Sequence, residues 1–172
     1  MTEPKSVLMV CLGNICRSPI AEACLRKILE ESYITNWKVD SAGTGDYHLG
    51  KSPDHRAMAI LKNHDINFSH KARQVLVQED FYNFDYILCM DQSNIENVKA
   101  LRPLKSKAKI ELLGKWDYKF PNKNVRDPYY DKDQESFEDV YQQCIYYCTN
   151  FFKDTFCYGF YYSGSLDVTM WK

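Results

Sequence analysis

The distribution of apolar residues along the chain predicts four short strands. Residues 6–11 form a continuously apolar and partly β-branched run, which is typical of a strand buried on both faces of a parallel sheet. A second run of this kind occupies residues 86–90, and shorter apolar segments at residues 37–41 and 109–113 predict two further strands. The sheet is therefore expected to be small and parallel.

Helical patterns alternate with these strands. Ser18 and Pro19 offer an N-cap and a proline at the first helical position, followed by a mostly apolar stripe. A second helix is predicted from about Pro53, and Asp91 can cap a third. Strands alternating with helices predict a doubly wound α/β fold, with ligands bound outside the carboxyl ends of the strands. The last helix is predicted to bury Phe137, Val140, Cys144, Ile145, Cys148, Phe151 and Phe152.

Length and composition indicate one cytoplasmic domain. The chain has 172 residues, with 22 basic against 23 acidic side chains, so no overall field favours nucleic acid or an anionic membrane. No apolar signal region or membrane-length run is present, and the seven cysteines are expected to stay reduced in the cytoplasm. We assign residues 1–156 to the domain. Residues 157–172 are aromatic and aperiodic, and we expect them to form a poorly ordered tail.

The loop after the first strand has the features of a phosphate-binding loop. Residues 11–18 read Cys-Leu-Gly-Asn-Ile-Cys-Arg-Ser and lead from a buried strand into a helix, whose unpaired N–H groups and dipole favour an anion. Gly13 and Asn14 tolerate the left-handed backbone angles that turn several N–H groups toward one centre. Arg17 can then complete the site with a planar fork that matches two phosphate oxygens.

Such a positive loop stabilises the thiolate of Cys11 and makes it a nucleophile. The plainer interpretation is that Cys11 is only the buried end of a strand. For Ser18, two roles stay open: an N-cap of the following helix, or a hydrogen bond to the Cys11 thiolate.

Several segments in the same order resemble the low-molecular-weight protein tyrosine phosphatases, also known as acid phosphatases. Residues 10–23 are similar to the signature of that family, and the resemblance covers about residues 5–156. Further similar segments lie at residues 40–42, 85–91, 110–114 and 127–130.

The resemblance implies a flavodoxin-like fold with a four-stranded parallel sheet of order 2-1-3-4. It also implies a reaction in which Cys11 attacks phosphorus and Asp127 protonates the leaving phenolate, then activates water to hydrolyse the phosphocysteine. Without the resemblance, Asp127 and Pro128 are explained equally well as turn residues. No metal or other cofactor is implied, because Arg17 and the loop amides neutralise the phosphate oxygens.

Substrate-binding residues are also implied by the resemblance. Tyr47 is similar to one wall of the phosphotyrosine pocket, and Tyr129 and Tyr130 to the opposite wall. In this family the latter pair is also phosphorylated. Exposed loop tyrosines without a role are the alternative for any of the three. The specificity loop departs from the family pattern before Tyr47, so the substrate preference does not transfer.

Around the phosphate loop, which includes Leu12 and Ile15, the resemblance implies supporting residues. Asn14, Ser41 and His70 match a hydrogen-bond network that holds the loop in place. Taken alone, His70 is more often an ordinary histidine. Cys16 is similar to the partner that captures an oxidised Cys11 as a reversible disulfide, which implies redox regulation.

The expected partners follow from this chemistry. Phosphotyrosine-containing proteins are the substrates, and inorganic phosphate is the product and an inhibitor. We expect a monomer with weak self-association.

Three other hypotheses stay open at this point. Residues 45–52 match the nucleotide-binding P-loop pattern, although Pro53 opposes a helix start at Ser52. An arsenate reductase would share the nucleophile loop, but it needs further reactive cysteines, whereas Cys144 and Cys148 lie on a predicted core face. A catalytically inactive phosphotyrosine-binding module is the third hypothesis.

Overall fold

Four parallel strands form the centre of the protein. The computed structural model describes the backbone of residues 3–161 and the side chains of residues 3–156. Its strands are β1 (Ser6–Cys11), β2 (Lys38–Gly43), β3 (Tyr86–Cys89) and β4 (Lys109–Leu112). Their order is β2-β1-β3-β4, with β1 paired to both β2 and β3. The predicted doubly wound sheet and its strand order are confirmed.

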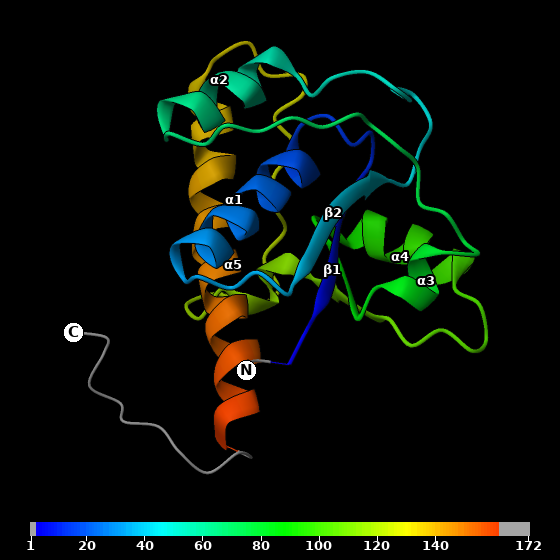
Figure 1. Ribbon diagram of the computed structural model, residues 1–172. Helices are drawn as coiled ribbons and strands as arrows, with labels where there is room; N and C mark the ends of the chain where they lie inside the picture. The colour runs from blue at the N-terminus through cyan, green and yellow to red at the C-terminus, as the bar shows by residue number, and fades with distance from the viewer. Residues whose placement is uncertain (1–2, 162–172) are drawn as a thin grey trace.

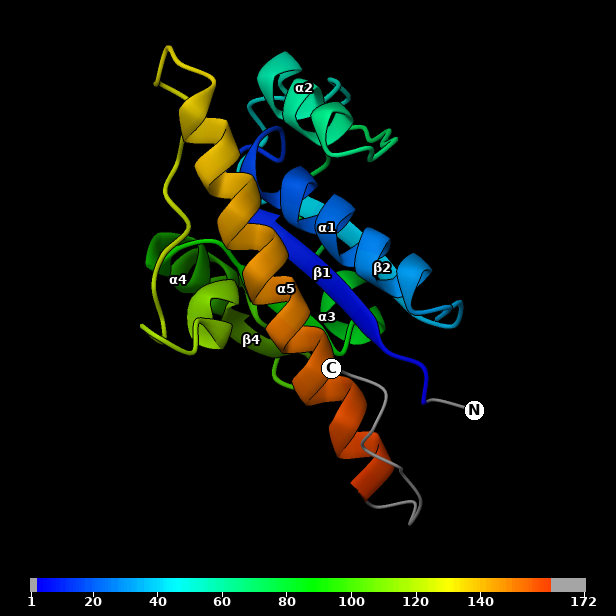
Figure 2. The same ribbon diagram turned by 90° about the vertical axis from the view of Figure 1, so that its left-hand side faces the viewer.

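Helices cover both faces of the sheet (Figures 1 and 2). On one face lie α1 (Arg17–Glu31), α2 (His55–Asn63) and the long α5 (Glu135–Tyr161). The other face carries α3 (Asp80–Asn83) and α4 (Gln92–Leu101). A short 3₁₀ helix, Leu113–Trp116, follows β4.

The side chains of strand β1 pack against helices on both faces of the sheet. Val7 and Met9 pack into the core beneath α1 and α5, whereas Leu8 and Val10 pack into a second core on the other face. All four side chains are fully buried, as the two-residue period of a central strand requires.

The helix boundaries differ from the predicted ones in two places. Helix α1 begins at Arg17 with Cys16 as its N-cap, so Ser18 is not the cap that the Ser-Pro pair predicts. The Ser18 hydroxyl is fully buried and faces Cys11 instead. Helix α3 is not predicted from the sequence, because four residues are too few to show a periodicity. Asp91 does cap α4, accepting a hydrogen bond from the Asn94 N–H at 2.8 Å.

The last helix extends further than the sequence predicts. The predicted tail starts at residue 157, whereas α5 continues to Tyr161, and residues 162–172 lie outside the described part of the chain. Its predicted core residues are buried, except Ile145, which is partly buried. Within the described residues, none of the helices is both long and apolar enough to cross a membrane.

At the carboxyl ends of β1 and β2, the loops that follow the two strands contact each other closely. Cys11 pairs with Gly43 at this edge, and a side chain at Gly43 would place its Cβ 2.7 Å from the Leu12 carbonyl oxygen. The N–H groups of Thr44 and Gly45 donate to the carbonyls of Cys11 and Leu12, both at 2.9 Å. The loop after β2 is thereby joined to the loop after β1.

Candidate active site

The loop at residues 11–18 curls around the sulfur of Cys11. The Asn14 N–H donates to Cys11 Sγ at 3.2 Å, and the Ser18 hydroxyl lies 3.0 Å from the same atom. Asn14 has a φ of 57°, in the left-handed region that the sequence predicts for this residue. The Cys11 sulfur thus accepts one backbone hydrogen bond and lies against the Ser18 hydroxyl, both from its own loop.

The side chain of Asn14 is the centre of the network behind this loop. It is fully buried, and its Nδ2 donates to the hydroxyls of Ser18 and Ser41, both at 2.9 Å. Its Oδ1 accepts from the Arg73 backbone N–H at 2.9 Å and lies 2.8 Å from His70 Nε2. The structure therefore brings together Asn14, Ser41 and His70, as the resemblance implies.

Glu22 extends the network and is a residue that the sequence does not reveal. Its Oε2 accepts from the Ser41 hydroxyl at 2.7 Å and lies 3.5 Å from His70 Nδ1. Burial raises the pKa of Glu22, and burial lowers the pKa of His70, so the neutral imidazole is favoured.

Glu22, Asp40 and His70 also form a group whose ligand atoms lie within 4.8 Å of one another. Both carboxylates already pair with guanidinium groups, Glu22 with Arg26 at 2.7 Å and Asp40 with Arg73 at 2.8 Å. A cation at this position would compete with both arginines for these carboxylates. The group is therefore better explained as an ion-pair network than as a metal site.

Arg17 connects the phosphate loop to two carboxylates. Its guanidinium lies 2.5 Å from Asp91 Oδ2 and 2.9 Å from Asp127 Oδ2, and it also donates to the Val125 carbonyl at 3.2 Å. Burial alone would lower the pKa of Arg17, but the surrounding negative groups, chiefly Cys11 and Asp127, outweigh it and raise the pKa. The guanidinium therefore carries its charge at the floor of the site.

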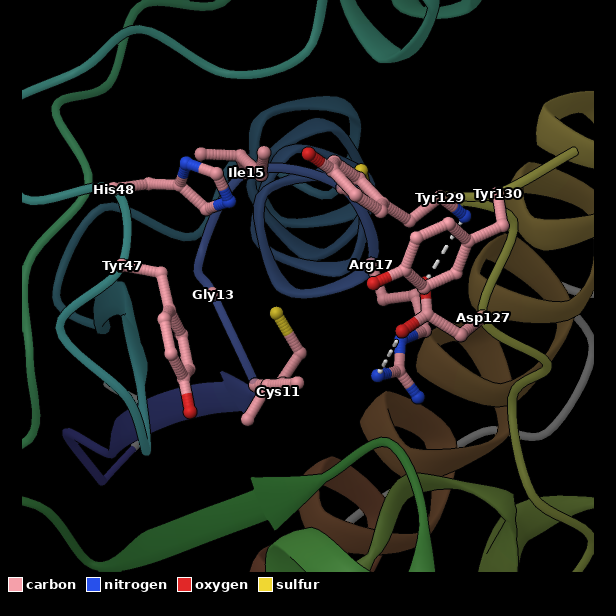
Figure 3. A pocket seen from close by; sticks show the side chains of 11 residues that line it. Cys11, Gly13, Ile15, Arg17, Tyr47, His48, Asp127, Tyr129 and Tyr130 are labelled. Atoms are coloured by element: carbon pink, nitrogen blue, oxygen red, sulfur yellow. Dashed lines mark hydrogen bonds and ion pairs between the residues drawn. The ribbon is translucent and has the colours of Figure 1, made fainter. Parts of the chain in front are cut away.

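A cavity of about 440 Å³ opens above the loop. In Figure 3, Tyr47 and His48 stand on one side of the Cys11 sulfur, and Arg17, Asp127 and Tyr130 stand on the other. The predicted residues that line the cavity are Cys11, Leu12, Gly13, Ile15, Cys16, Arg17, Tyr47, Asp127, Tyr129 and Tyr130. The supporting residues Asn14, Ser18, Ser41 and His70 lie behind this lining.

Two further contacts at the site were not foreseen from the sequence. His48 lines the cavity and lies close to Gly13 of the phosphate loop. A Cβ added to Gly13 would lie 2.9 Å from His48 Cδ2. Asp91 is predicted as a helix cap and not as a partner of Arg17, yet it pairs with Arg17. Its position directly after a central strand is the signal that could have indicated the second role, because ligand sites lie at that edge.

Comparison with known proteins decides the family. A family model described as low molecular weight phosphotyrosine protein phosphatase matches residues 6–155. The chain belongs to this family. A human phosphatase of that name is 53% identical over 152 residues, covering 86% of this chain and 93% of the human one.

Solved structures of similar proteins agree with this family. The crystal structure of Primo-1 has a TM-score of 0.84 at 43% identity, covering 87% of this chain and 97% of its own. A protein tyrosine phosphatase from Entamoeba histolytica has a TM-score of 0.80 at 35% identity, covering 86% and 94%. The resemblance of residues 10–23, the predicted fold and the prediction of a phosphatase enzyme are confirmed.

The structure of this low molecular weight phosphatase disagrees with the P-loop and arsenate reductase hypotheses. In the P-loop hypothesis Lys51 and Ser52 open a helix, but α2 begins only at His55, and the Ser52 hydroxyl accepts from Lys71 at 3.1 Å. For an arsenate reductase, Cys144 and Cys148 would have to be accessible, whereas both are fully buried.

Cys16 belongs to the phosphate loop and lines the phosphatase cavity. Its side chain is buried, and burial, followed by the negative charge of Asp54, raises the pKa of its thiol. Cys16 therefore differs chemically from a nucleophilic thiolate, and its role as partner of Cys11 stays a prediction.

Proposed function

We propose that this protein hydrolyses phosphotyrosine in proteins, and small aryl phosphates, through a phosphocysteine intermediate on Cys11. The observation that carries the proposal is the arrangement of three side chains in one cavity. The Cys11 sulfur faces the cavity, and Arg17 and Asp127, which pair at 2.9 Å, lie together on one side of it (Figure 3). Nucleophile, phosphate ligand and acid therefore surround a single position.

In the first step, the loop amides and Arg17 bind the phosphate oxygens while the Cys11 sulfur attacks phosphorus. The S–P bond forms and the P–O bond breaks, and the ester oxygen takes the proton of Asp127. This proton matters because a phenol with a pKa near 10 leaves poorly as an anion. An incoming phosphate competes with Asp127 for Arg17. Once released from this ion pair, the carboxylate takes up a proton from solvent and faces the leaving oxygen as the acid.

In the second step, water replaces the sulfur. Asp127 accepts a proton from the water as its oxygen bonds to phosphorus, and the S–P bond breaks to release the thiolate. The Ser18 hydroxyl, 3.0 Å from Cys11 Sγ, can donate to this thiolate and makes it a better leaving group. Inorganic phosphate is left in the loop, which is why we expect it to inhibit.

The walls of the cavity suit an aromatic ester. Tyr47, on the loop after β2, faces Tyr129 and Tyr130 across the sulfur, and the latter two rings pack edge to face with centroids 4.9 Å apart. A phenyl ring between these walls gains stacking contacts that an alkyl ester lacks. Phosphotyrosine proteins are therefore the proposed partners.

Reversible oxidation and a cytoplasmic location are part of the proposal. A peroxide would convert the Cys11 thiolate to a sulfenic acid, and condensation with the Cys16 thiol would form a disulfide and release water. A reducing compartment keeps the nucleophile active and resolves this disulfide. The support is that both cysteines line the same cavity.

The test is hydrolysis of an aryl phosphate in excess EDTA by the native protein, Cys11→Ser and Asp127→Ala. We expect activity to survive chelation, since Arg17 and the amides supply the positive charge, and to vanish in Cys11→Ser. The Asp127→Ala variant should lose about 10²- to 10⁴-fold in kcat/KM. Asp139→Ala, at an exposed position on α5, is the matched control. Activity that requires magnesium, or that persists in Cys11→Ser, would refute the mechanism. An absence of turnover would favour the inactive binding module.

A further inference from the structure

Asp127 lies on an exposed turn that needs an anchor other than the substrate site. The Asp131 N–H donates to the Pro128 carbonyl at 3.1 Å, which closes the turn, and the side chains of Asp127 and Tyr130 are exposed. Its visible tie to the site is the ion pair with Arg17. Phosphate would occupy that same guanidinium, so this tie weakens when a substrate binds.

Arg56, from the first turn of α2, holds the turn from the opposite side. Its Nη1 donates to the Asp131 carbonyl at 2.5 Å and its Nη2 donates to the Tyr129 carbonyl at 3.1 Å. One planar group thereby bridges two backbone carbonyls with donors held in a fixed geometry, whereas the three donors of a lysine ammonium rotate on a flexible stem. Arg56 does not line the cavity, so these contacts persist when the cavity is filled.

The guanidinium of Arg56 is itself held rigidly. Asp54 accepts from its Nε at 3.0 Å and from its Nη2 at 2.8 Å, and the ring of Phe137 lies 4.4 Å below its Cζ. The hydrogen bonds that Arg56 donates to Asp54 are the main cause of its raised pKa. The arginine is thus oriented before any substrate arrives.

Asp54 also connects this arginine to the phosphate loop. Its backbone N–H donates to the Ile15 carbonyl at 2.8 Å, and its side chain caps α2. A continuous chain of contacts therefore runs from Ile15 through Asp54 and Arg56 to the carbonyls of Tyr129 and Asp131. It fixes the distance between the loop that binds phosphate and the turn that carries the acid.

We infer that Arg56 is a positioning residue that keeps Asp127 within reach of the leaving oxygen once phosphate has taken Arg17. The inference rests on the proposed function, because it assumes that Asp127 is the acid. It predicts that losing Arg56 lowers activity by an amount that depends on the leaving group. A displaced turn moves Asp127 away from the leaving oxygen, and this slows the reaction most for strongly basic leaving groups, which need the proton most.

The experiment compares Arg56→Met, which keeps the length of the side chain but lacks the fork, with the native protein. We expect kcat/KM for phenyl phosphate, which has a strongly basic leaving group, to fall about 10- to 100-fold. The loss should be several-fold smaller for p-nitrophenyl phosphate, which has a weakly basic one. In an Asp127→Ala background the same substitution should cost no further activity. Arg102→Met, at an exposed position at the end of α4, is the control and should behave like the native protein.

The outcomes separate this inference from the mechanism on which it rests. An equal loss for both substrates, or the same loss with and without Asp127, would overturn the role of Arg56. Full activity of Arg56→Lys would also overturn it, because a lone ammonium would then suffice, and this milder variant covers the case in which Arg56→Met does not fold. If Asp127→Ala itself leaves kcat/KM unchanged, the proposed acid is wrong.

Discussion

Replacing Asn14 by alanine is the most direct test of the network behind the phosphate loop. The substitution removes four side-chain hydrogen bonds, to Ser18, Ser41, His70 and the Arg73 N–H, from a fully buried position. It also places a residue with a Cβ but no local hydrogen bond at a φ of 57°. Both effects oppose the geometry that surrounds Cys11.

The expected magnitude follows from these contacts. Four buried hydrogen bonds at about 1 kcal/mol each give a loss of about 4 kcal/mol, and left-handed backbone adds about 1 kcal/mol for alanine. The loss of stability is partly reduced, because Ser41 keeps its hydrogen bond to Glu22 and Ser18 stays beside Cys11. A net loss of about 3–5 kcal/mol is a large part of the 5–15 kcal/mol typical of a domain.

Urea unfolding and aryl phosphate hydrolysis together measure this prediction. Asn14→Gly is the companion variant, because it loses the same hydrogen bonds without the backbone strain, and we expect it to be about 1 kcal/mol more stable than Asn14→Ala. Both variants should lose about 100-fold in kcat/KM, the cost of a small misplacement of the reacting groups. If Asn14→Gly unfolds within about 1 kcal/mol of the native protein, the network does not hold the loop as argued.

Three other substitutions test separate parts of the structure. Gly114→Ala should lower the melting temperature measurably, because its Cβ would lie too close to the Lys123 carbonyl oxygen, a backbone atom. Burial lowers the pKa of His70 below its usual 6.5. As pH drops through 6.5, His70 therefore binds a proton in the unfolded chain before it does so in the folded protein, and the stability of the fold decreases. His70→Gln should show a shallower fall in urea unfolding between pH 7.5 and 5.5, and one proton changes the slope by at most about 1.4 kcal/mol per pH unit. Tyr47→Ala should raise KM for aryl phosphates about 3- to 10-fold and leave alkyl phosphates unchanged.

Strands and long helices could be predicted because their signals are local. The apolar run at residues 6–11 and the face of α5 each reflect burial on a fixed period. The start of α1 could not be predicted in the same way. A serine before proline usually caps a helix, but here the hydroxyl of Ser18 bonds to groups of the phosphate loop instead, and the helix begins two residues earlier, at Arg17.

Within the candidate site, contiguous residues are predictable and distant partners are not. The loop that carries Cys11 and Arg17 has its own pattern and position after a strand. His70 and Asp127 enter through the family resemblance alone. The pairing of Arg17 with Asp91 joins residues that are 74 positions apart, and no period or local spacing encodes it.

The two carboxylates on Arg17 differ in how firmly they are held, and this difference bears on the proposed mechanism. Asp91 is fixed as the cap of α4 and its side chain is 22% exposed, whereas Asp127 lies on a turn and is 41% exposed. In the proposed mechanism, a phosphate that needs the guanidinium fork would displace the partner that costs less to move, Asp127. Asp91 would then keep Arg17 oriented toward the substrate. The same exchange would release Asp127 to act as the proposed acid when a leaving oxygen is present to receive its proton.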